Sequence, residues 1–424
     1  MCGRVEVVTD IENRGPSSFH TAGNPLTVRP LTEADRDDAI RLDGTAFLGS
    51  TPPDFLTDFV IPTLEIERYT GVFDDSELVG VAGIFTKDIT FPGGRQVPFA
   101  GVTWVGVKPG YTGRGILRSL MTDQLHGLHT RGQEPVALLT ASESGIYGRF
   151  GYGMATRNAS FEIPSGTAFK TDPPRGTVKQ IPREQALPHL KEIHRRVAAV
   201  SPGYLSRPES IWSLLYSDHE IYRSGRSTLE FAVHADGFLA FRTKGNFDER
   251  GPRGELLVHE LCAATPEARA ALWRHVLDYS LVREIIYPRG SVDEMLQDLV
   301  VDPRALKTST RDHLWLRIVD LDRTVPLRSY SAAADVVVRV VDTFCPWNDG
   351  TWALSLGPTG GTAVRTSDPE QITLDITDLA ATFLGDVRLA RFAAAGRVTG
   401  DAGAIRALDL ALSTPLAPWS PEGF

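Results

Sequence analysis

The sequence predicts two successive α/β units followed by a smaller α+β unit. A chain of 424 residues is too long for one ordinary hydrophobic core, so two or three domains are expected. Between residues 26 and 163 the pattern reads strand, helix, three strands, helix and strand, and a similar order returns between 164 and 318. From 319 onwards short strands and short helices alternate, which is typical of an α+β domain.

The first unit begins with a strand over Leu26–Arg29 and a helix whose entry, Thr32 followed by Asp35, has the form of a capping arrangement. Two strand patterns joined by the polar turn 74–76 indicate a hairpin. A later helix carries apolar residues at helical spacing: Leu117, Leu120, Met121, Leu125 and Leu128. Residues 1–25 show little periodicity and many turn formers, so we expect a mobile tail there.

The second unit repeats this order in a degenerate form. A hairpin is expected over 230–244, and a strand, turn and helix over 256–280. Its turn, Thr265–Arg269, contains no glycine. We interpret the second unit as a degenerate internal repeat, with a chance similarity of two α/β units as the alternative. The last unit is expected to hold four strands, at 334–342, 351–357, 362–367 and 372–377, and three helices, at 379–385, 387–396 and 404–413.

Composition restricts the partners and the compartment. A net charge of −9 argues against nucleic acid or an anionic membrane as the main partner and is compatible with a cationic substrate. The three cysteines, Cys2, Cys262 and Cys345, have neither metal-site nor disulfide spacing, so free thiols and no metal are expected. No apolar run is long enough to span a bilayer, and the N-terminus lacks a signal-peptide pattern, so we predict a cytoplasmic protein.

A glycine-rich segment, KPGYTGRG, separates the strand that ends at Val107 from the helix that starts near Gly115. Glycines allow backbone N–H groups to converge on an anion, and the N-terminal end of the helix dipole favours negative charge. Arg114 and Arg118 can add positive charge. The segment therefore predicts a pyrophosphate site, and a plain strand-to-helix connection is the alternative.

A short buried strand is expected over 135–142, and a second motif, SGIYGRFGYG, follows it from Ser144. Tyr147 stands in it between glycines, where a phenol can reach the sulfur that departs when a thioester is aminolysed. That reaction needs an acid for the thiolate and a base for the ammonium. The alternative is that Tyr147, Phe150 and Tyr152 only pack. The histidines His126, His129 and His194 have no partners at metal-ligand spacing and are expected on the surface or in packing roles.

These two motifs, with the later DHLWLRI and the terminal Phe, resemble the enhanced intracellular survival (Eis) family of aminoglycoside N-acetyltransferases, which belongs to the GNAT superfamily. The resemblance covers nearly the whole chain apart from residues 1–25. It implies two GNAT-like domains, at 26–163 and, in degenerate form, at 164–318, and a sterol-carrier-protein-like α+β domain at 319–424. It also implies a homo-oligomer, a hexamer.

The same resemblance implies the site residues. Tyr147 is the general acid, and the C-terminal carboxylate of Phe424 is the general base. The segments that match the family's acetyl-CoA contacts are Val105, Gly106 and Val107, then Gly113, Arg114, Gly115, Ile116, Leu117 and Arg118, and finally Ser142 and Glu143. The chain departs from the family pattern at Thr112 and Leu117 in the loop, at Gly423, where the family often has an acidic residue, and in the segment 45–59.

The implied activity is transfer of an acetyl group from acetyl-CoA to primary amines of polycationic small molecules, with aminoglycosides, acetylated at several positions, as the leading class. Acetylation of protein lysines or peptide amines is an alternative that uses the same residues. A non-enzymatic acyl-CoA-binding or lipid-binding protein is another alternative. A long-chain acyltransferase is a third, since N-myristoyltransferases also join two GNAT regions and use a terminal carboxylate.

Overall fold

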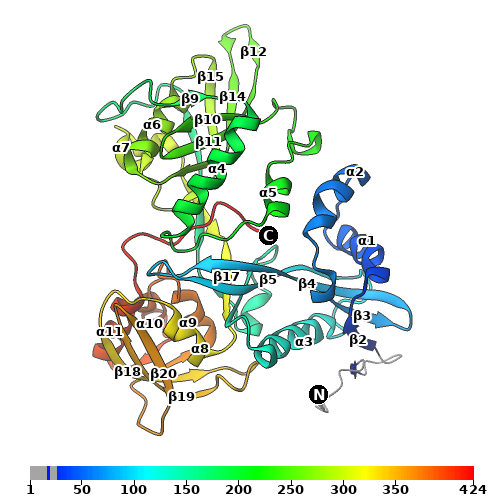
Figure 1. Ribbon diagram of the computed structural model, residues 1–424. Coiled ribbons are helices and arrows are strands. Elements are labelled where there is room, and N and C mark those ends of the chain that lie inside the picture. Colours follow the sequence, from blue (N-terminus) through cyan, green and yellow to red (C-terminus); the bar gives the residue numbers. More distant parts are fainter. Residues whose placement is uncertain (1–16, 20–25) are drawn as a thin grey trace.

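A computed structural model describes residues 17–19 and 26–424 of the chain (Figure 1). Three units can be distinguished by their sheets. The first unit is built on an eight-stranded sheet, the second on a seven-stranded sheet and the third on a five-stranded sheet. In Figure 1 the second unit lies at the top and the first and third units lie side by side below it. The red C-terminal segment leaves the third unit and ends between the upper and lower parts.

The first sheet has the strand order β1-β2-β3-β4-β5-β6-β17-β7. Its neighbours are antiparallel except β5 and β6, which are parallel. The bounds are β1 Ser17–Phe19, β2 Leu26–Pro30, β3 Thr70–Asp74, β4 Glu77–Thr90, β5 Gln96–Val107, β6 Val136–Thr140, β17 Leu314–Ile318 and β7 Gly153–Met154.

Two helices cover opposite faces of this sheet. A side chain at Gly80 on β4 would meet Ile116 and Leu120 of α3 (Ile116–Arg131), so α3 lies directly on that face. A side chain at Gly106 on β5 would meet Leu42 and Ala46 of α1 (Arg36–Ala46) on the other face. The predicted capping arrangement ahead of α1 is present, since the backbone N–H of Thr32 donates to the carboxylate of Asp35 at 2.9 Å.

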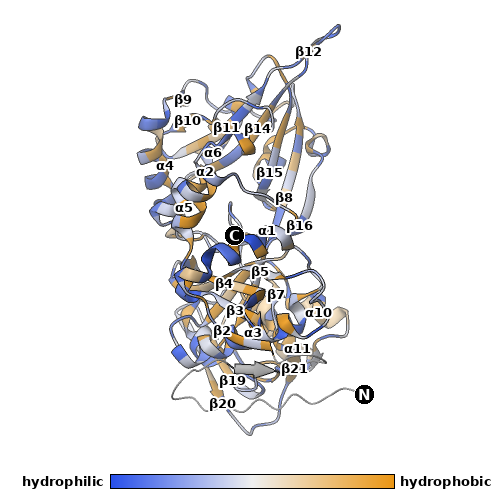
Figure 2. Cartoon of the chain, turned by 90° about the vertical axis from the view of Figure 1, so that its right-hand side faces the viewer, coloured by the Kyte–Doolittle hydropathy of each residue, from blue (hydrophilic) through white to orange (hydrophobic). Residues whose placement is uncertain are grey.

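The second sheet has the order β16-β8-β15-β14-β11-β10-β9, in which only β14 and β15 are parallel. Helix α4 (Arg183–Ala198) carries both hydropathy colours in Figure 2, because Ala186, Leu190 and Ile193 face the core while its charged residues lie at least partly exposed on the other face. The strands are β16 Ser309–Asp312, β8 Arg157–Pro164, β15 Val282–Ser291, β14 Gly254–Ala263, β11 Gly237–Lys244, β10 Glu230–His234 and β9 Lys179–Gln180. The other helices are α5 Glu209–Leu215, α6 Pro266–Leu277 and α7 Leu296–Leu299, and a small hairpin is formed by β12 Phe247–Asp248 and β13 Gly251–Pro252.

The first and second units exchange strands. Strand β8 follows β7 in the chain but pairs with β15 of the second sheet. Strand β17 comes after the whole second unit but pairs with β6, and with β7, in the first sheet. Both sheets therefore cross chain position 163, at which the sequence places a domain boundary. Each sheet needs a strand from beyond that position to be complete.

The third unit shares its core with the first. Its sheet has the order β20-β19-β18-β21-β22. One continuous apolar cluster joins Phe99 and Leu316 of the first sheet to Val338 and Leu354 of the third. The elements are α8 Leu321–Thr324, β18 Ala334–Val341, β19 Gly350–Gly357, β20 Gly360–Arg365, β21 Ile372–Asp375, α9 Ile376–Thr382, α10 Leu389–Ala394, β22 Thr399–Gly400 and α11 Ala402–Leu412.

The predictions for the N-terminal residues and the cysteines have mixed outcomes. The tail expected over 1–25 lies outside the described residues except for Ser17–Phe19, which form the edge strand β1. Cys2 also lies outside them. Cys262 and Cys345 are buried free thiols, as predicted. Over 17–19 and 26–424, the structure contains no helix with the length and apolarity needed to cross a membrane.

Candidate active site

Strands β5 and β6 separate at the edge of the predicted cofactor segment. Their parallel pairing ends at Gly101 and Leu138, although β5 continues to Val107 and β6 to Thr140. In the part of β5 that follows Gly101, the residues Gly106 and Val107 pair with β4 on one side and with no described strand on the other. Their other edge faces the place where β6 has turned away, so its backbone groups are available to an extended ligand. The predicted residues 105–107 all lie on this open edge.

A bulge in β5 lies just ahead of these residues. The register with β4 shifts between Val81 and Gly83, and Trp104 adopts a positive φ of 52°. Such a conformation is strained for a bulky residue, and bulges of this kind are concentrated next to active sites. The Trp104 ring packs edge-on against Tyr69 at 6.0 Å between ring centroids. The strand is therefore bent where the ligand edge begins.

The glycine-rich loop leads into the N-terminus of α3. Gly113 and Gly115 have φ values of 78° and 82°, a region that favours glycine, and no described atom lies within 4 Å of a Cβ built on either. No side chain in the described part of the chain caps α3. The first N–H groups of a 16-residue helix thus point into open space, which suits a phosphate group.

The predicted residues around this helix start have different environments. Arg114 lies 4.0 Å from the Asp74 carboxylate and over the Tyr111 ring. Arg118 lies over the ring of Phe344, in the third unit, at 5.2 Å from its centroid. Ile116 is buried and Leu117 packs against the same apolar cluster. Arg114 and Arg118 are thus held at the helix start by contacts of their own, and Ile116 and Leu117 fix the helix on the sheet.

Tyr147 begins the 3₁₀ turn Tyr147–Phe150 after β6. It is buried, and burial, with a smaller contribution from the negative charge of Glu143, raises its pKa to about 12. The phenol therefore keeps its proton at neutral pH and can act as an acid but not as a phenolate base. Ser142 and Glu143 lie exposed between the end of β6 and this turn.

Glycines in the same motif let the third unit approach the turn closely. A Cβ on Gly153 would lie 2.1 Å from the carbonyl oxygen of Thr377 in α9, and one on Gly151, whose φ is 82°, would collide with Arg317. The Thr377 hydroxyl also donates to the carbonyl of Gly148 at 3.3 Å. The third unit therefore supports the turn that carries Tyr147.

The chain end lies on β5 at the point where β5 and β6 separate. The Phe424 ring packs against Phe85 and Phe99, with centroid distances of 6.5 and 5.8 Å, and a Cβ on Gly101 would be 3.2 Å from it. The Thr140 hydroxyl at the end of β6 donates to a terminal oxygen of Phe424. The structure thus places the C-terminal carboxylate beside Thr140, which precedes Ser142 by two residues in the chain.

Several residues around the chain end were missed by the sequence analysis. Glu422, the acidic residue nearest to the chain end, is buried and forms an ion pair with Arg207 at 3.0 Å. Lys87 lies 3.8 Å from its other oxygen, and His313 Nε2 lies 2.9 Å from its backbone carbonyl oxygen. A lysine inside the apolar strand β4 is a visible signal in the sequence, but its partners are not.

The segment 45–59 reaches across to the second unit. It contains the short helix α2 (Pro53–Phe55), and the Phe55 ring packs edge-on against Tyr222 at 4.9 Å between centroids. His219 Nε2 lies 3.2 Å from the Asp54 carboxylate. The residues between α1 and β3 therefore bridge the first two units above the chain end, as α2 and α5 do in Figure 1.

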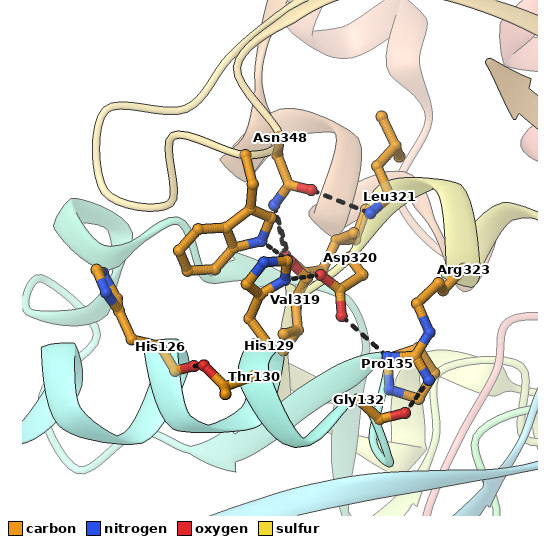
Figure 3. Close-up of polar contacts among 12 residues, drawn as sticks. His126, His129, Thr130, Gly132, Pro135, Val319, Asp320, Leu321, Arg323 and Asn348 are labelled. Atoms are coloured by element: carbon orange, nitrogen blue, oxygen red, sulfur yellow. Dashed lines mark hydrogen bonds and ion pairs between the residues drawn. The ribbon is translucent and has the colours of Figure 1, made fainter. Parts of the chain in front are cut away.

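The three histidines have packing roles. His129 is paired with the buried Asp320 and stacks on Trp347 with 4.1 Å between ring centroids (Figure 3). His126, one turn earlier on α3, meets the same indole edge-on at 5.0 Å. His194 is buried in the second unit, and burial lowers its pKa to about 2. In the described residues no group of three or more His, Cys, Asp or Glu side chains has a metal-binding arrangement.

Comparison with known proteins places this geometry in a family. Residues 27–155 and 203–318 each match a model of an acetyltransferase (GNAT) domain, and residues 321–421 match a sterol carrier protein domain. An uncharacterized N-acetyltransferase of Streptomyces avermitilis is 37% identical over 370 residues, which cover 85% of this chain and 90% of that one. The N-acetyltransferase Eis of Mycobacterium tuberculosis is 31% identical over 352 residues, covering 81% of this chain and 85% of that one. This chain belongs to the Eis-like GNAT N-acetyltransferases.

Solved structures agree with the fold of this Eis-like enzyme. Eis1 from Mycobacterium abscessus is 33% identical, with a TM-score of 0.82 over 94% of this chain and all of that one. A GCN5-related N-acetyltransferase from Anabaena variabilis shares the fold at 18% identity, with a TM-score of 0.79 over the same shares of the two chains. The predicted fold class, two GNAT domains followed by a sterol-carrier-like domain, is confirmed.

Proposed function

We propose that this Eis-like N-acetyltransferase transfers the acetyl group of acetyl-CoA to primary amines of polycationic small molecules, and that aminoglycosides, acetylated at several positions, are its leading substrate class. The observation that carries the proposal is the position of the chain end. The carboxylate of Phe424 is bound by Thr140 where β5 and β6 separate, and the Tyr147 turn follows shortly after β6. In the proposed reaction Tyr147 supplies the acid and the Phe424 carboxylate supplies the base at the open edge of β5.

Acetyl-CoA fits the open strand edge and the loop. The backbone of 105–107 would pair with the pantetheine arm as an added strand would. The N–H groups of 113–118, at the start of α3, would bind the pyrophosphate, and Ser142 and Glu143 would contact the cofactor beyond the end of β6. The open space around Gly113 and Gly115 supports this assignment, because any side chain there would fill it.

Phe424 and Tyr147 carry out the proton transfers of the proposed reaction. The substrate ammonium loses a proton to the Phe424 carboxylate, directly or through water, and the free amine attacks the thioester carbonyl. The carboxylate releases this first proton to water. As the C–N bond forms and the C–S bond breaks, the attacking nitrogen loses its second proton to the same carboxylate, and Tyr147 gives its proton to the departing thiolate. The phenol is fully protonated at neutral pH because burial raises its pKa to about 12. Its proton is then replaced from solvent.

Charge supports a polycationic substrate. The chain carries a net charge of −9, and the bridging segment above the chain end contributes the exposed acids Asp54 and Asp58. Half-buried Asp43 on α1 has its pKa raised to about 6 by burial, so it is mostly ionised at neutral pH. Negative potential of this kind concentrates cations near a site and speeds their arrival.

A panel of amines tests the proposal. Aminoglycosides, linear polyamines, lysine peptides and a folded protein would each be incubated with acetyl-CoA, and products would be counted by mass spectrometry. We expect the highest kcat/KM for aminoglycosides and more than one acetyl group per molecule. Preferential acetylation of lysine peptides would contradict the proposed aminoglycoside class and favour peptide amines as substrates. CoA binding without transfer to any amine would overturn the proposed reaction.

Two further expectations belong to the same proposal. We propose that the protein acts in the cytoplasm, where acetyl-CoA is available, and that it assembles as a homohexamer by analogy with the family. Light scattering coupled to size-exclusion chromatography measures the mass of the assembly directly. A monomeric mass at micromolar concentration would contradict the second expectation and leave the chemistry unaffected.

A further inference from the structure

Four charged side chains meet in the interior where the first two units and the chain end come together. They are Lys87 on β4, Arg207 between α4 and α5, Glu260 on β14 and Glu422 in the C-terminal segment. Their side chains are 2%, 1%, 5% and 3% exposed. Burying one such charge alone is costly, so the two positive and two negative groups must compensate one another.

Arg207 binds both carboxylates. Its Nε donates to Glu422 Oε2 at 3.0 Å, and its two terminal nitrogens donate to the two oxygens of Glu260 at 3.0 and 3.1 Å. The Tyr216 hydroxyl donates to Glu260 at 2.7 Å and fixes that partner. The guanidinium is therefore held rigidly by the second unit before it meets the chain end.

Lys87, on strand β4 of the first unit, is the second positively charged residue beside Glu422. Its Nζ lies 3.8 Å from Glu422 Oε1, which has no hydrogen-bond partner among the described residues, and 5.6 Å from the centre of the Phe424 ring. The Glu422 carboxylate is thus held between a cation of the first sheet and a cation of the second unit. It is the last side chain with a charge before the chain ends.

The backbone of the C-terminal segment is fixed at the same place. The carbonyl of Glu422 accepts from Ser420 Oγ at 2.9 Å and lies 2.9 Å from His313 Nε2. A Cβ on Gly423 would lie 2.9 Å from the Thr140 side chain, so the chain passes closely beside β6. Chain ends normally fray, and two residues span only about 7 Å, so a shift of Glu422 would shift the terminal carboxylate.

From this arrangement we infer that Glu422 is a positioning residue. Its ion pairs with Arg207 and Lys87 hold the Phe424 carboxylate at Thr140. The inference rests on the proposed role of that carboxylate as the general base. It also assigns a role to the second unit, which supplies Arg207 and Glu260 to orient a group that acts in the first.

Two measurements on Glu422→Ala and the milder Glu422→Gln test the inference. Steady-state kinetics should show kcat reduced about tenfold or more, which is 1.4 kcal/mol or more in the barrier, with the Kd for CoA unchanged. Carboxypeptidase A should release phenylalanine from both variants faster than from the wild type. The control is Asp409→Asn, which weakens the ion pair of the buried Asp409 with the exposed Arg388 in the third unit and should change neither quantity.

A double-mutant cycle separates positioning from general loss of stability. A single glycine added after Phe424 converts the Phe424 carboxylate into a peptide amide and places the new carboxylate one residue further on. If Glu422 acts through that carboxylate, Glu422→Ala should lower kcat in the native-length enzyme and have no further effect in the extended one. Equal fold-losses in both backgrounds, or wild-type kcat and phenylalanine release in the Glu422 variants, would overturn the inference. A native kcat for the extension alone would instead overturn the proposed base.

Discussion

The first and second GNAT units use the same strand, turn and helix in opposite ways. In the first, β5 runs through a loop of glycines into α3, whose N-terminus is not capped by any side chain in the described chain. In the second, β14 runs through a short turn into α6, where the Thr265 side chain accepts from the N–H of Ala268 at 3.2 Å and Pro266 occupies the first helical position. One helix start is open to a ligand and the other is closed by its own sequence.

In this comparison the proposed pyrophosphate site depends on the connection between strand and helix rather than on the scaffold. Both units have a parallel strand pair with a helix between the two strands. Only the first unit combines that pair with an open helix start and with a tyrosine turn. The second unit contributes Arg207 and Glu260 to the chain end, so the degenerate repeat serves the site without carrying one.

The largest expected effect separates the two units by their tyrosines. Tyr147→Phe should lower kcat by about 10²–10⁴-fold, the usual contribution of a general acid, with the Kd for CoA unchanged. The control is Tyr279→Phe in the second unit, whose hydroxyl bonds only Gln180 in the described structure and should be neutral. Kinetics at saturating acetyl-CoA measure both. A Tyr147→Phe turnover within about twofold of wild type would remove this residue from the mechanism.

A smaller effect is expected at the two N-cap positions. Gly115→Val should weaken CoA binding by about tenfold or more, or 1.4 kcal/mol, because a β-branched residue is strained at positive φ and fills the phosphate space. Gly113→Val should behave in the same way. Thr265→Gly in the second unit should leave CoA affinity unchanged. Calorimetric titration decides: equal affinities in a folded Gly115→Val protein would place the pyrophosphate elsewhere.

The side-chain cap that Thr265 provides at the start of α6 should contribute to stability and not to catalysis. Thr265→Ala removes the side-chain cap of α6 and should cost about 1 kcal/mol of the free energy of unfolding. Denaturant unfolding measures that cost, and kcat measured on the same sample should not change. A drop in kcat that exceeds the loss of folded protein would show that the second unit is functionally coupled through α6.

The smallest expected effect concerns the dependence of kcat on pH. Ionisation of Tyr147 should not lower kcat at alkaline pH. The phenol acts in its protonated form, and a raised pKa extends that form to higher pH. With a pKa of about 12, Tyr147 should stay protonated throughout the range in which the enzyme is assayed. A profile of kcat against pH should therefore show no fall caused by Tyr147 between about pH 8 and 10, near the pKa of an ordinary tyrosine. Loss of activity in that interval that is absent in Tyr147→Phe would contradict the assignment.

Local patterns in the sequence predicted local structure well. The helix expected from Leu117 to Leu128 is α3, and the strand expected over 135–142 is β6. The glycine loop lies where predicted because backbone preferences act within a few residues. The motif that contains Gly151 and Gly153 gives no local reason for these two glycines. Gly153 is required by the close approach of α9, more than 200 residues later in the chain, and Gly151 by Arg317 of β17 and by Ile376 of α9.

Pairing between distant residues was beyond the sequence analysis. The alternation of apolar residues in β8 and β17 does not tell which sheet each strand completes. The four charges around Glu422 come from positions spread over the whole chain, so their compensation becomes visible only in the fold. The role of the terminal carboxylate came from family resemblance, because an ordinary chain end would be expected to fray.

The most direct test of the central claim is the turnover of an enzyme extended by a few residues after Phe424, with a protease site that restores the native end. The extension converts the carboxylate to an amide, which cannot act as a base. At saturating acetyl-CoA, kcat should fall by about 10²-fold or more and recover on cleavage, while CoA affinity and Tm stay the same. A native kcat in the uncleaved enzyme would show that the base lies elsewhere and would contradict the account.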